Sequence, residues 1–252
     1  MNKDSLGDRM KRYENVTRNY LVRRTPVIVR LDGKAFHTLT AKHCVKPFDD
    51  HFHHAMEKTS IRLLEEVQGC TFVYTQSDEI SLLLFDYQKL DTQAWFDNNI
   101  QKMVSVSASI ASVTFSTVFG EQGFFDARAF NLPEAEVCNY FVWRQNDAIR
   151  NSIQAVGQAH FSQKELHKLN VDQIKAKLLS EHGVNWDLHI KTKFKRGLAV
   201  SRVPNIVDSG VTANFANWIA LGYPNYKPVV DEEIPIFSQN REFVERHLPK
   251  TI

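Results

Sequence analysis

The order of apolar segments in the first 130 residues is the feature that most constrains the fold. Short runs rich in aromatic and β-branched residues, the composition of strands, lie at 27–31, 70–75, 80–85 and 124–130. Two longer stretches, 49–68 and 97–119, carry apolar residues at the spacing of one helix face. The order β-α-β-β-α-β predicts a split βαβ, or ferredoxin-like, sheet. In that topology the first and third strands are neighbours.

Two aspartates lie at the ends of these neighbouring strands. Side chains alternate across a strand, so Asp32 shares one face with Ile28 and Arg30 and marks the point where the strand ends. Asp78 and Glu79 lie at the tip of the hairpin that the second and third strands form. We therefore expect the carboxylates of Asp32 and Asp78 at the same edge of the sheet. Paired carboxylates supply the hard oxygen ligands of a two-metal phosphoryl-transfer site.

The hairpin tip departs from ordinary turn chemistry. Its sequence, Gln76-Ser77-Asp78-Glu79, contains neither Gly nor Asn, the residues that tight hairpins favour where φ is positive. Departures of this kind mark functional sites more often than stabilising ones. The competing interpretation is that Asp32 and Asp78 are only polar ends of strands.

Composition indicates an ordinary soluble globular protein. The 252 residues, 43% of them hydrophobic, are enough for one large core or two modest ones. A net charge of +2 is too small for a strongly basic nucleic-acid-binding domain, so RNA contacts must come from local patches. Cys44, Cys70 and Cys138 have neither disulfide nor zinc spacing, which favours a reducing cytoplasm. The uncharged stretch 103–119 is rich in Ser and Thr, which argues against a membrane span.

Leu132-Pro133-Glu134 is the predicted boundary between two parts of the chain. Another helix follows it, marked by Val142, Ile149, Ile153 and Val156. We expect a catalytic core at 1–132 and a mainly helical C-terminal region at 133–252 that packs on this core.

Four motifs occur in a fixed order along the chain. They are VIVRLDGKAFH at 27–37, TQSDEIS at 75–81, FDAR at 125–128 and WRQND at 143–147. Together they resemble the motifs of the tRNA-His guanylyltransferase family, especially its bacterial and archaeal guanylyltransferase-like branch. The resemblance implies an α+β fold whose ferredoxin-like core is similar to the palm of polymerases. It also implies a homotetramer, with no membrane association, that adds nucleotides to the 5′ end of tRNA.

The same resemblance implies roles for individual residues. Asp32, the backbone carbonyl of Gly33 and Asp78 would hold two Mg2+ ions, with Glu79 supporting them. ATP or GTP would activate the RNA 5′-monophosphate, and the 3′-hydroxyl of an incoming nucleotide would then attack the activated end. The positions that match nucleotide-binding positions of the family are Gly33, Lys34, Ala35, Phe36, His37, Lys46, Asp49, Ser77 and Lys102. Those that match positions near the activated 5′ end are Arg144, Asp147 and Asn151.

Two segments depart from the eukaryotic branch of that family. Ile149-Arg150-Asn151-Ser152 stands where that branch has His-Ile-Asn-Asn, a motif that accompanies addition of one guanosine to tRNA-His. We therefore expect templated repair of 5′-truncated RNAs, with the incoming base chosen by pairing. Asp97-Asn98-Asn99 is acidic and neutral where the eukaryotic enzymes are basic, which predicts activation with fewer cations.

Two groups of residues have two interpretations each. An extended segment at 191–195 would place three lysines on one face: Lys191, Lys193 and Lys195. That face would be either a stripe that binds the RNA backbone or a solvated strand edge. His51, His53 and His54 resemble a metal cluster, but successive helical residues point in different directions, which favours a plain helix surface. Trp143 is predicted to pack in the core.

Two other functions compete with nucleotide addition. A nucleotide cyclase on the same palm would usually carry a Gly-rich hairpin before its acids, and this hairpin has none. A non-catalytic RNA-binding protein would be hindered by clustered acids, which repel phosphate unless a metal neutralises them.

Overall fold

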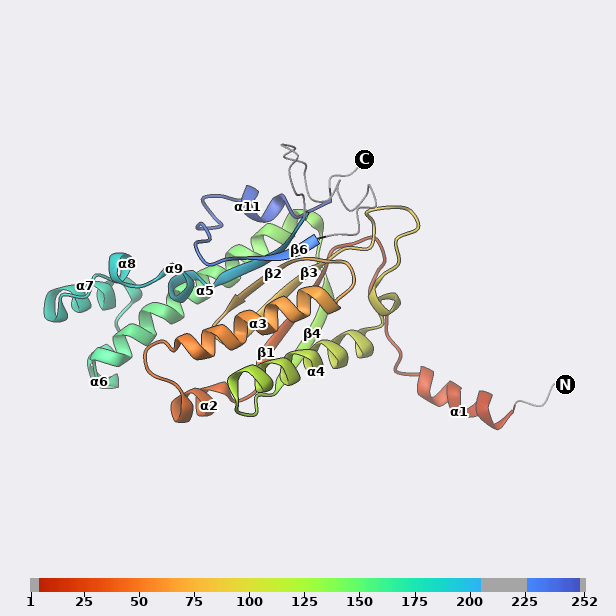
Figure 1. Ribbon diagram of the computed structural model, residues 1–252, viewed down its shortest axis with the longest axis horizontal. Coiled ribbons are helices and arrows are strands. Elements are labelled where there is room, and N and C mark those ends of the chain that lie inside the picture. Colours follow the sequence, from red (N-terminus) through yellow and green to blue (C-terminus); the bar gives the residue numbers. More distant parts are fainter. Residues whose placement is uncertain (1–4, 205–225, 250–252) are drawn as a thin grey trace.

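A computed structural model describes residues 5–204 and 226–249, arranged around one six-stranded antiparallel sheet (Figure 1). The strand order is β4-β1-β3-β2-β5-β6. The strands are β1 Val27–Gly33, β2 Cys70–Gln76, β3 Glu79–Leu84, β4 Phe125–Asn131, β5 Leu198–Pro204 and β6 Tyr226–Asp231. The first four strands of this order form the predicted ferredoxin-like sheet, so the α+β fold is confirmed.

Helices cover both faces of the sheet (Figure 1). The longer ones are α1 Leu6–Asn15, α2 Phe36–His43, α3 Asp50–Glu66, α4 Ile100–Phe119, α5 Glu134–His160 and α7 Val171–His182. The short ones are η1 Trp95–Asn98, α6 Gln163–Leu166, α8 Trp186–His189, α9 Thr192–Arg196 and α11 Glu242–Glu245. The described part of α1 buries none of its side chains and lies apart from the sheet.

One face of the sheet packs against α3 and α4. Val29 and Leu31 of β1 are fully buried there, together with Met56 of α3 and Phe115 of α4. α4 is the one described helix long and apolar enough to cross a membrane, with a hydropathy of 1.3. In this structure Met103 and Phe115 turn its inner side to the sheet.

The opposite face packs against α5. Ile28, which alternates with Val29 along β1, is buried there with Phe72 of β2 and Phe141 of α5. Because strand side chains alternate, Arg30 and Asp32 lie on this α5 face as well.

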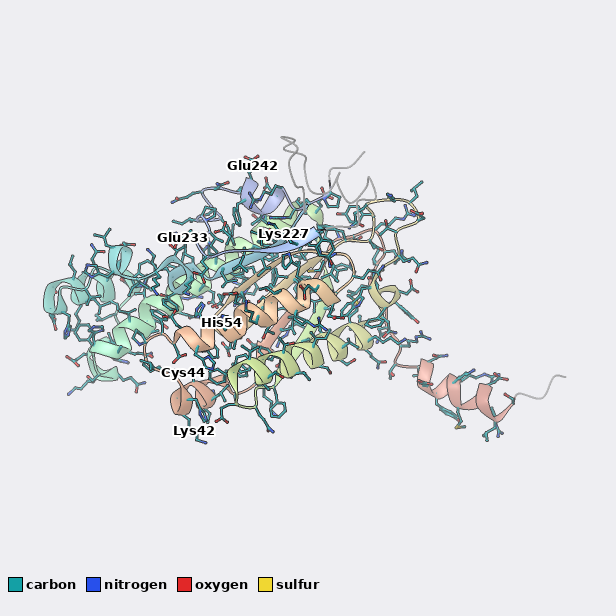
Figure 2. The ribbon with its side chains drawn as sticks, in the orientation of Figure 1. Lys42, Cys44, His54, Lys227, Glu233 and Glu242 are labelled. Carbon is teal, nitrogen blue, oxygen red and sulfur yellow. The ribbon has the colours of Figure 1, made fainter. Side chains whose placement is uncertain are left out.

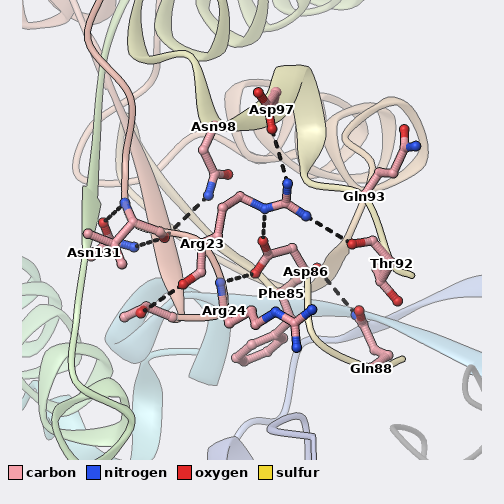
Figure 3. Close-up of polar contacts among 12 residues, drawn as sticks. Arg23, Arg24, Phe85, Asp86, Gln88, Thr92, Gln93, Asp97, Asn98 and Asn131 are labelled. Carbon is pink, nitrogen blue, oxygen red and sulfur yellow. Dashed lines mark hydrogen bonds and ion pairs between the residues drawn. The ribbon is translucent and has the colours of Figure 1, made fainter. Parts of the chain in front are cut away.

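A polar network closes the end of the sheet at which β1 begins (Figure 3). The Arg23 guanidinium donates to Asp86 at 2.5 Å and to Asp97 at 3.0 Å. The Asn98 amide donates to the backbone oxygen of Val22 at 3.3 Å, and the Asn99 side chain caps α4. The segment Asp97-Asn98-Asn99 therefore has a structural role that fixes where α4 starts.

The C-terminal region contains more strand than predicted. β5 pairs with β2, and β6 pairs with β5, so both extend the sheet of the core. The sequence does not predict β5 and β6, because the pairing of β5 is with a strand remote in sequence. The spacing of apolar residues alone does not reveal such a partner. Residues on both sides of the predicted boundary at 132 thus share one sheet. The predicted regions also include 1–4, 205–225 and 250–252, which lie outside the described residues.

Gly197, between α9 and β5, has φ 81° and ψ −169°, and a Cβ there would lie 2.3 Å from the Thr75 backbone oxygen. We expect Gly197→Ala to lower the free energy of unfolding by about 2–6 kcal/mol, from backbone strain plus overpacking. Gly183→Ala is the matched control, since Gly183 also has a positive φ, 65°, but an added Cβ would have nothing within 4 Å. There the backbone strain alone should cost about 1–2 kcal/mol. Urea unfolding measures both, and equal losses would contradict the close approach.

Candidate active site

The predicted meeting of Asp32 and the hairpin tip is present in the structure. Asp32 lies opposite Glu79 in the β1–β3 register. The Gly33 amide also donates to the Asp78 backbone oxygen at 3.1 Å, which ties the tip to the end of β1. The turn is tight because only Ser77 and Asp78 separate the two strands, and Ser77 adopts a φ of 49°. The unusual turn sequence therefore accompanies a strained residue at the sheet edge.

The carboxylates of Asp32 and Asp78 are the ones available to a cation. Within 5–204 and 226–249, the Asp32 carboxylate has no hydrogen bond or ion pair, and Asp78 accepts a bond of 3.0 Å from the Ser77 hydroxyl. Burial raises the pKa of Asp78, and the charge of Asp32 raises it further. Asp126 of β4 lies directly opposite Asp32, but its carboxylate accepts a bond of 3.1 Å from Arg128. Like charges across a strand pair are destabilising unless a cation lies between them.

The donor set fits a hard cation that arrives with a substrate. No group of three or more His, Cys, Asp or Glu side chains is placed to hold a metal in the described ranges. Mg2+ does not need such a group, because it is usually held by one or two carboxylates together with waters and substrate phosphates. Asp32 and Asp78, with the Gly33 carbonyl, are compatible with that pattern.

Glu79 belongs to a different arrangement. Arg144 of α5 donates to both of its carboxylate oxygens at 2.7 Å, and each side chain is 8% exposed. Arg144 also contacts Asp147 at 2.9 Å, and Asp147 is paired with Arg150 as well. Burial raises the pKa of Glu79, and the bonds from Arg144 oppose that rise. Glu79 and Arg144 therefore join α5 to the hairpin tip, and neither is free for a ligand.

A cleft opens beside the carboxylate edge. Its first part, about 320 Å³, is lined by Gly33, Ala35, Phe36, His37, Thr40, Phe52, Ser77 and Asp78. A second part, about 200 Å³, shares Thr40, Phe52 and Ser77 with the first and adds Lys46, Asp49, Asn151 and Lys193. Figure 2 shows Lys42 and Cys44 at the end of α2, where Cys44 lines this second part. The structure thus gathers most of the residues predicted to bind nucleotide.

Two of the predicted residues have specific local partners. The Asp49 carboxylate caps α3 by accepting from the amides of Phe52 at 2.8 Å and Val45 at 3.0 Å, so it shapes the cleft wall. The Lys46 ammonium donates to the Thr40 hydroxyl at 2.9 Å. Lys34 is exposed in the turn after β1, and its amide donates to the Phe124 backbone oxygen at 2.7 Å.

Aromatic residues that the sequence did not single out form the outer wall of the cleft. The rings of Phe48 and Phe194 are stacked at 4.8 Å, and His53 meets Phe194 edge-on at 4.7 Å. Burial lowers the pKa of His53 to about 4, so it is neutral at pH 7. His51 and His54 are exposed, as expected of a helix surface. No local pattern could have paired Phe48 with Phe194, because they are remote in sequence.

Lys102 is not brought to this cleft within one chain. It lies in the first turn of α4, in a groove lined also by Lys11 of α1 and by Arg18, which follows α1. The following strand, β4, begins opposite Gly33, so the other end of α4 is the one near the carboxylates. The 20 residues of α4 span about 30 Å, which separates Lys102 from the cleft.

Two predictions about single segments are wrong. The segment with Lys191, Lys193 and Lys195 is not extended, because Thr192–Arg196 forms α9. Lys193 pairs with Asp50 at 3.3 Å, and Lys195 donates to a backbone oxygen at 2.7 Å, so no common stripe exists. Trp143 is 53% exposed rather than buried. The buried side of α5 includes Tyr140, Phe141 and Arg144, which leaves Trp143 at its margin.

Comparison with known proteins agrees with the fold and the site. Residues 7–133 match the family described as tRNAHis guanylyltransferase. An uncharacterised protein of Acanthamoeba polyphaga mimivirus is 28% identical over 84% of this chain and 83% of its own length. A probable tRNA(His) guanylyltransferase of Mus musculus is 32% identical over 50% of this chain, which spans 45% of that protein.

Solved structures extend the likeness to nearly the whole chain. A bacterial tRNA(His) guanylyltransferase-like protein in complex with ATP has a TM-score of 0.84 and 43% identity, covering 96% of this chain and 98% of that one. The tRNA(His) guanylyltransferase of Saccharomyces cerevisiae, at 20% identity and a TM-score of 0.67, shares the fold. Fold and site define a nucleotidyltransferase. The chain belongs to the tRNAHis guanylyltransferase family.

Arg144→Met should lower the free energy of unfolding by about 3–5 kcal/mol, because it leaves the Glu79 carboxylate buried without its partner. Arg62→Met is the control, since Arg62 pairs with Glu66 at the surface at 2.6 Å and its loss costs less than about 1 kcal/mol. Urea unfolding separates the two. Equal losses would show that the buried pair does not hold α5 to the hairpin.

Asp78→Asn should stabilise the metal-free protein at neutral pH. A raised pKa means that the folded state binds the Asp78 proton more tightly than the unfolded state does. The stabilisation of the fold by that proton is therefore fully present below the ordinary pKa of 3.8 and is lost as pH rises through the folded pKa. The melting temperature of the variant should exceed that of the wild type at neutral pH, and the difference should vanish in acid. Thermal scans with EDTA test this, and a gap that persists in acid would assign the effect to something other than ionisation.

Proposed function

We propose that the protein is a Mg2+-dependent 3′-to-5′ nucleotidyltransferase that adds nucleotides to the 5′ end of tRNA after ATP or GTP activates the 5′-phosphate. The observation that carries the proposal is the pair of available carboxylates at this end of the sheet: Asp78 lines the cleft, and Asp32 directly precedes Gly33, which lines it too. The solved relative complexes with ATP and with GTP, each 43% identical to this chain, support nucleotides as substrates.

Asp32, Asp78 and the carbonyl of Gly33 would hold the metal. Mg2+ bound there would neutralise phosphate charge and stabilise the attacking and leaving oxygens of an in-line displacement. The Arg144–Glu79 pair keeps the hairpin tip in place, so Asp78 stays beside Asp32. The bound cation would also offset the repulsion between these two acids.

The start of α2 is suited to the triphosphate. Ala35 adopts a φ of 57° and provides no side-chain cap, so the first amides of the helix, including those of Phe36 and His37, face the cleft without a capping partner. Unpaired amides at a helix N-terminus bind phosphate oxygens. Lys46 would add a point charge from the adjoining wall.

The reaction has two displacements. The RNA 5′-phosphate attacks the α-phosphorus of ATP or GTP and releases pyrophosphate. The 3′-hydroxyl of the incoming nucleotide then attacks the activated 5′-phosphate and releases AMP or GMP. Each step breaks one phosphoanhydride bond, and the geometry required is in-line positioning rather than covalent catalysis.

We infer templated repair of 5′-truncated RNA rather than obligatory guanylylation of tRNA-His. Asn151, the one residue kept from the eukaryotic motif, lines the cleft and lies 3.4 Å from Asp147. Base pairing with the opposite strand would then choose the incoming nucleotide. Cytoplasmic location and a homotetrameric assembly stay predictions.

Asp32→Ala and Asp78→Ala should each reduce nucleotide addition by at least about 100-fold, since each removes charge stabilisation at the reacting phosphates. The assay uses tRNA lacking its first nucleotide, with each triphosphate supplied separately and with Mg2+ or EDTA. Addition should require Mg2+. The same assay separates the other candidates, because a cyclase would consume triphosphate without extending RNA, and a non-catalytic binder would do neither.

Asp126→Asn is the matched control for these variants. Asp126 lies opposite Asp32 at the same edge, but Arg128 occupies its carboxylate. It should retain most of the activity. Full activity of Asp32→Ala, or equal loss in all three variants, would contradict the assignment of the carboxylates.

A further inference from the structure

An exposed aromatic ring lies on the α5 face of the sheet, near the carboxylate edge. Trp143 is 53% exposed. The guanidinium carbons of Arg144 and Arg30 lie 4.4 Å and 6.0 Å from the centre of its ring. Tyr140 meets the ring at 5.9 Å with an interplanar angle of 64°. The ring is thus held by neighbours while part of it stays open to solvent.

The position of this ring follows from the fold. Arg30 lies two residues before Asp32 on the same face of β1, which separates their Cα atoms by about 7 Å. Arg144, the next residue after Trp143, is fixed by its two bonds to Glu79. Trp143 therefore overlies β1 just before Asp32. It does not line either part of the cleft.

Arg30 beneath this ring has unused hydrogen-bonding capacity. Its side chain makes no hydrogen bond or ion pair with any described residue, and its Nε atom is buried without a partner. It lies opposite Arg128 in the β1–β4 register, and the Arg128 guanidinium already donates to Asp126. A buried donor without a partner costs free energy. An anion such as a phosphate would pair with the remaining donors of the Arg30 guanidinium.

We infer that Trp143 stacks the terminal base of the RNA 5′ end, with Arg30 contacting a phosphate beside that base. The inference rests on the proposed function and adds a contact for the RNA substrate to it. A partly exposed aromatic ring with arginines beside it suits a nucleic acid, which offers a π face and a negative charge together. Stacking tolerates every base, which suits an enzyme acting on ends truncated at different positions.

The first experiment measures binding of a tRNA lacking its 5′ nucleotide, without triphosphate. Trp143→Ala should weaken binding by about 5- to 150-fold, the range measured for loss of one base-stacking aromatic. Trp143→Phe should restore most of the affinity, because the ring is kept. Leu188→Ala, on α8, is the control, since Leu188 is 78% exposed and its loss should leave binding unchanged.

The second experiment reports stacking itself. The RNA carries 2-aminopurine as its 5′-terminal base, and the fluorescence of this base should be quenched when the RNA binds the wild-type protein. With Trp143→Ala, the emission should remain at saturating protein, whereas a purely structural role of the indole would leave the quenching intact. Thermal scans and size-exclusion chromatography establish that the variant keeps its fold and its assembly.

Distinct outcomes separate this inference from the proposed function. If the wild type binds and extends the RNA but Trp143→Ala does so equally well with equal quenching, the stacking contact is refuted and the function stands. If Trp143→Ala instead changes the oligomeric state, the ring belongs to a protein interface and the inference is overturned. If the wild type neither binds nor extends the RNA, the proposed function itself fails.

Discussion

The antiparallel pairing of β1 with β3 is the constraint on which the rest of this structure depends. It sets Asp32 opposite Glu79, and the hydrogen bond from the Gly33 amide to the Asp78 carbonyl locks the hairpin tip to the end of β1. A slip of one residue would send Asp32 to the α3 and α4 face and Leu31 to the α5 face. The buried apolar residues on both faces prevent this slip, so the position of the carboxylates is fixed by the packing of the core.

The acids at this edge divide into two groups with different tasks. Glu79 is buried and held by Arg144, whereas Asp78 lines the cleft, and both Asp78 and the neighbouring Asp32 have few protein partners. Asp78 and Glu79 are adjacent in sequence but have different roles, because Asp78 lies in the turn and Glu79 begins β3. The paired acid supplies rigidity, and the unpaired acids keep their oxygens for a ligand. This division is what the proposed metal and nucleotide site requires.

Much of this architecture was predictable because it depends on local periodicity. The two helices and four strands of the ferredoxin-like core follow from apolar spacing alone, and Asp49 was correctly placed at the start of α3. The errors come from contacts between remote segments and from one short helix, α9, that the sequence pattern did not indicate. Trp143 faces solvent because neighbouring positions of α5 meet the sheet, and Lys193 belongs to α9 and to ion pairs rather than to an extended stripe.

The sequence by itself determined the order of the core elements and the identity of the acids at their ends, since strand and helix periods are properties of neighbouring residues. Only the tertiary structure decided which acids are free and which are paired. It also decided that β5 and β6 extend the sheet and that Lys102 lies at the far end of α4. The physical reason is that pairing, burial and distance between remote residues depend on the packed chain, and no local spacing encodes them.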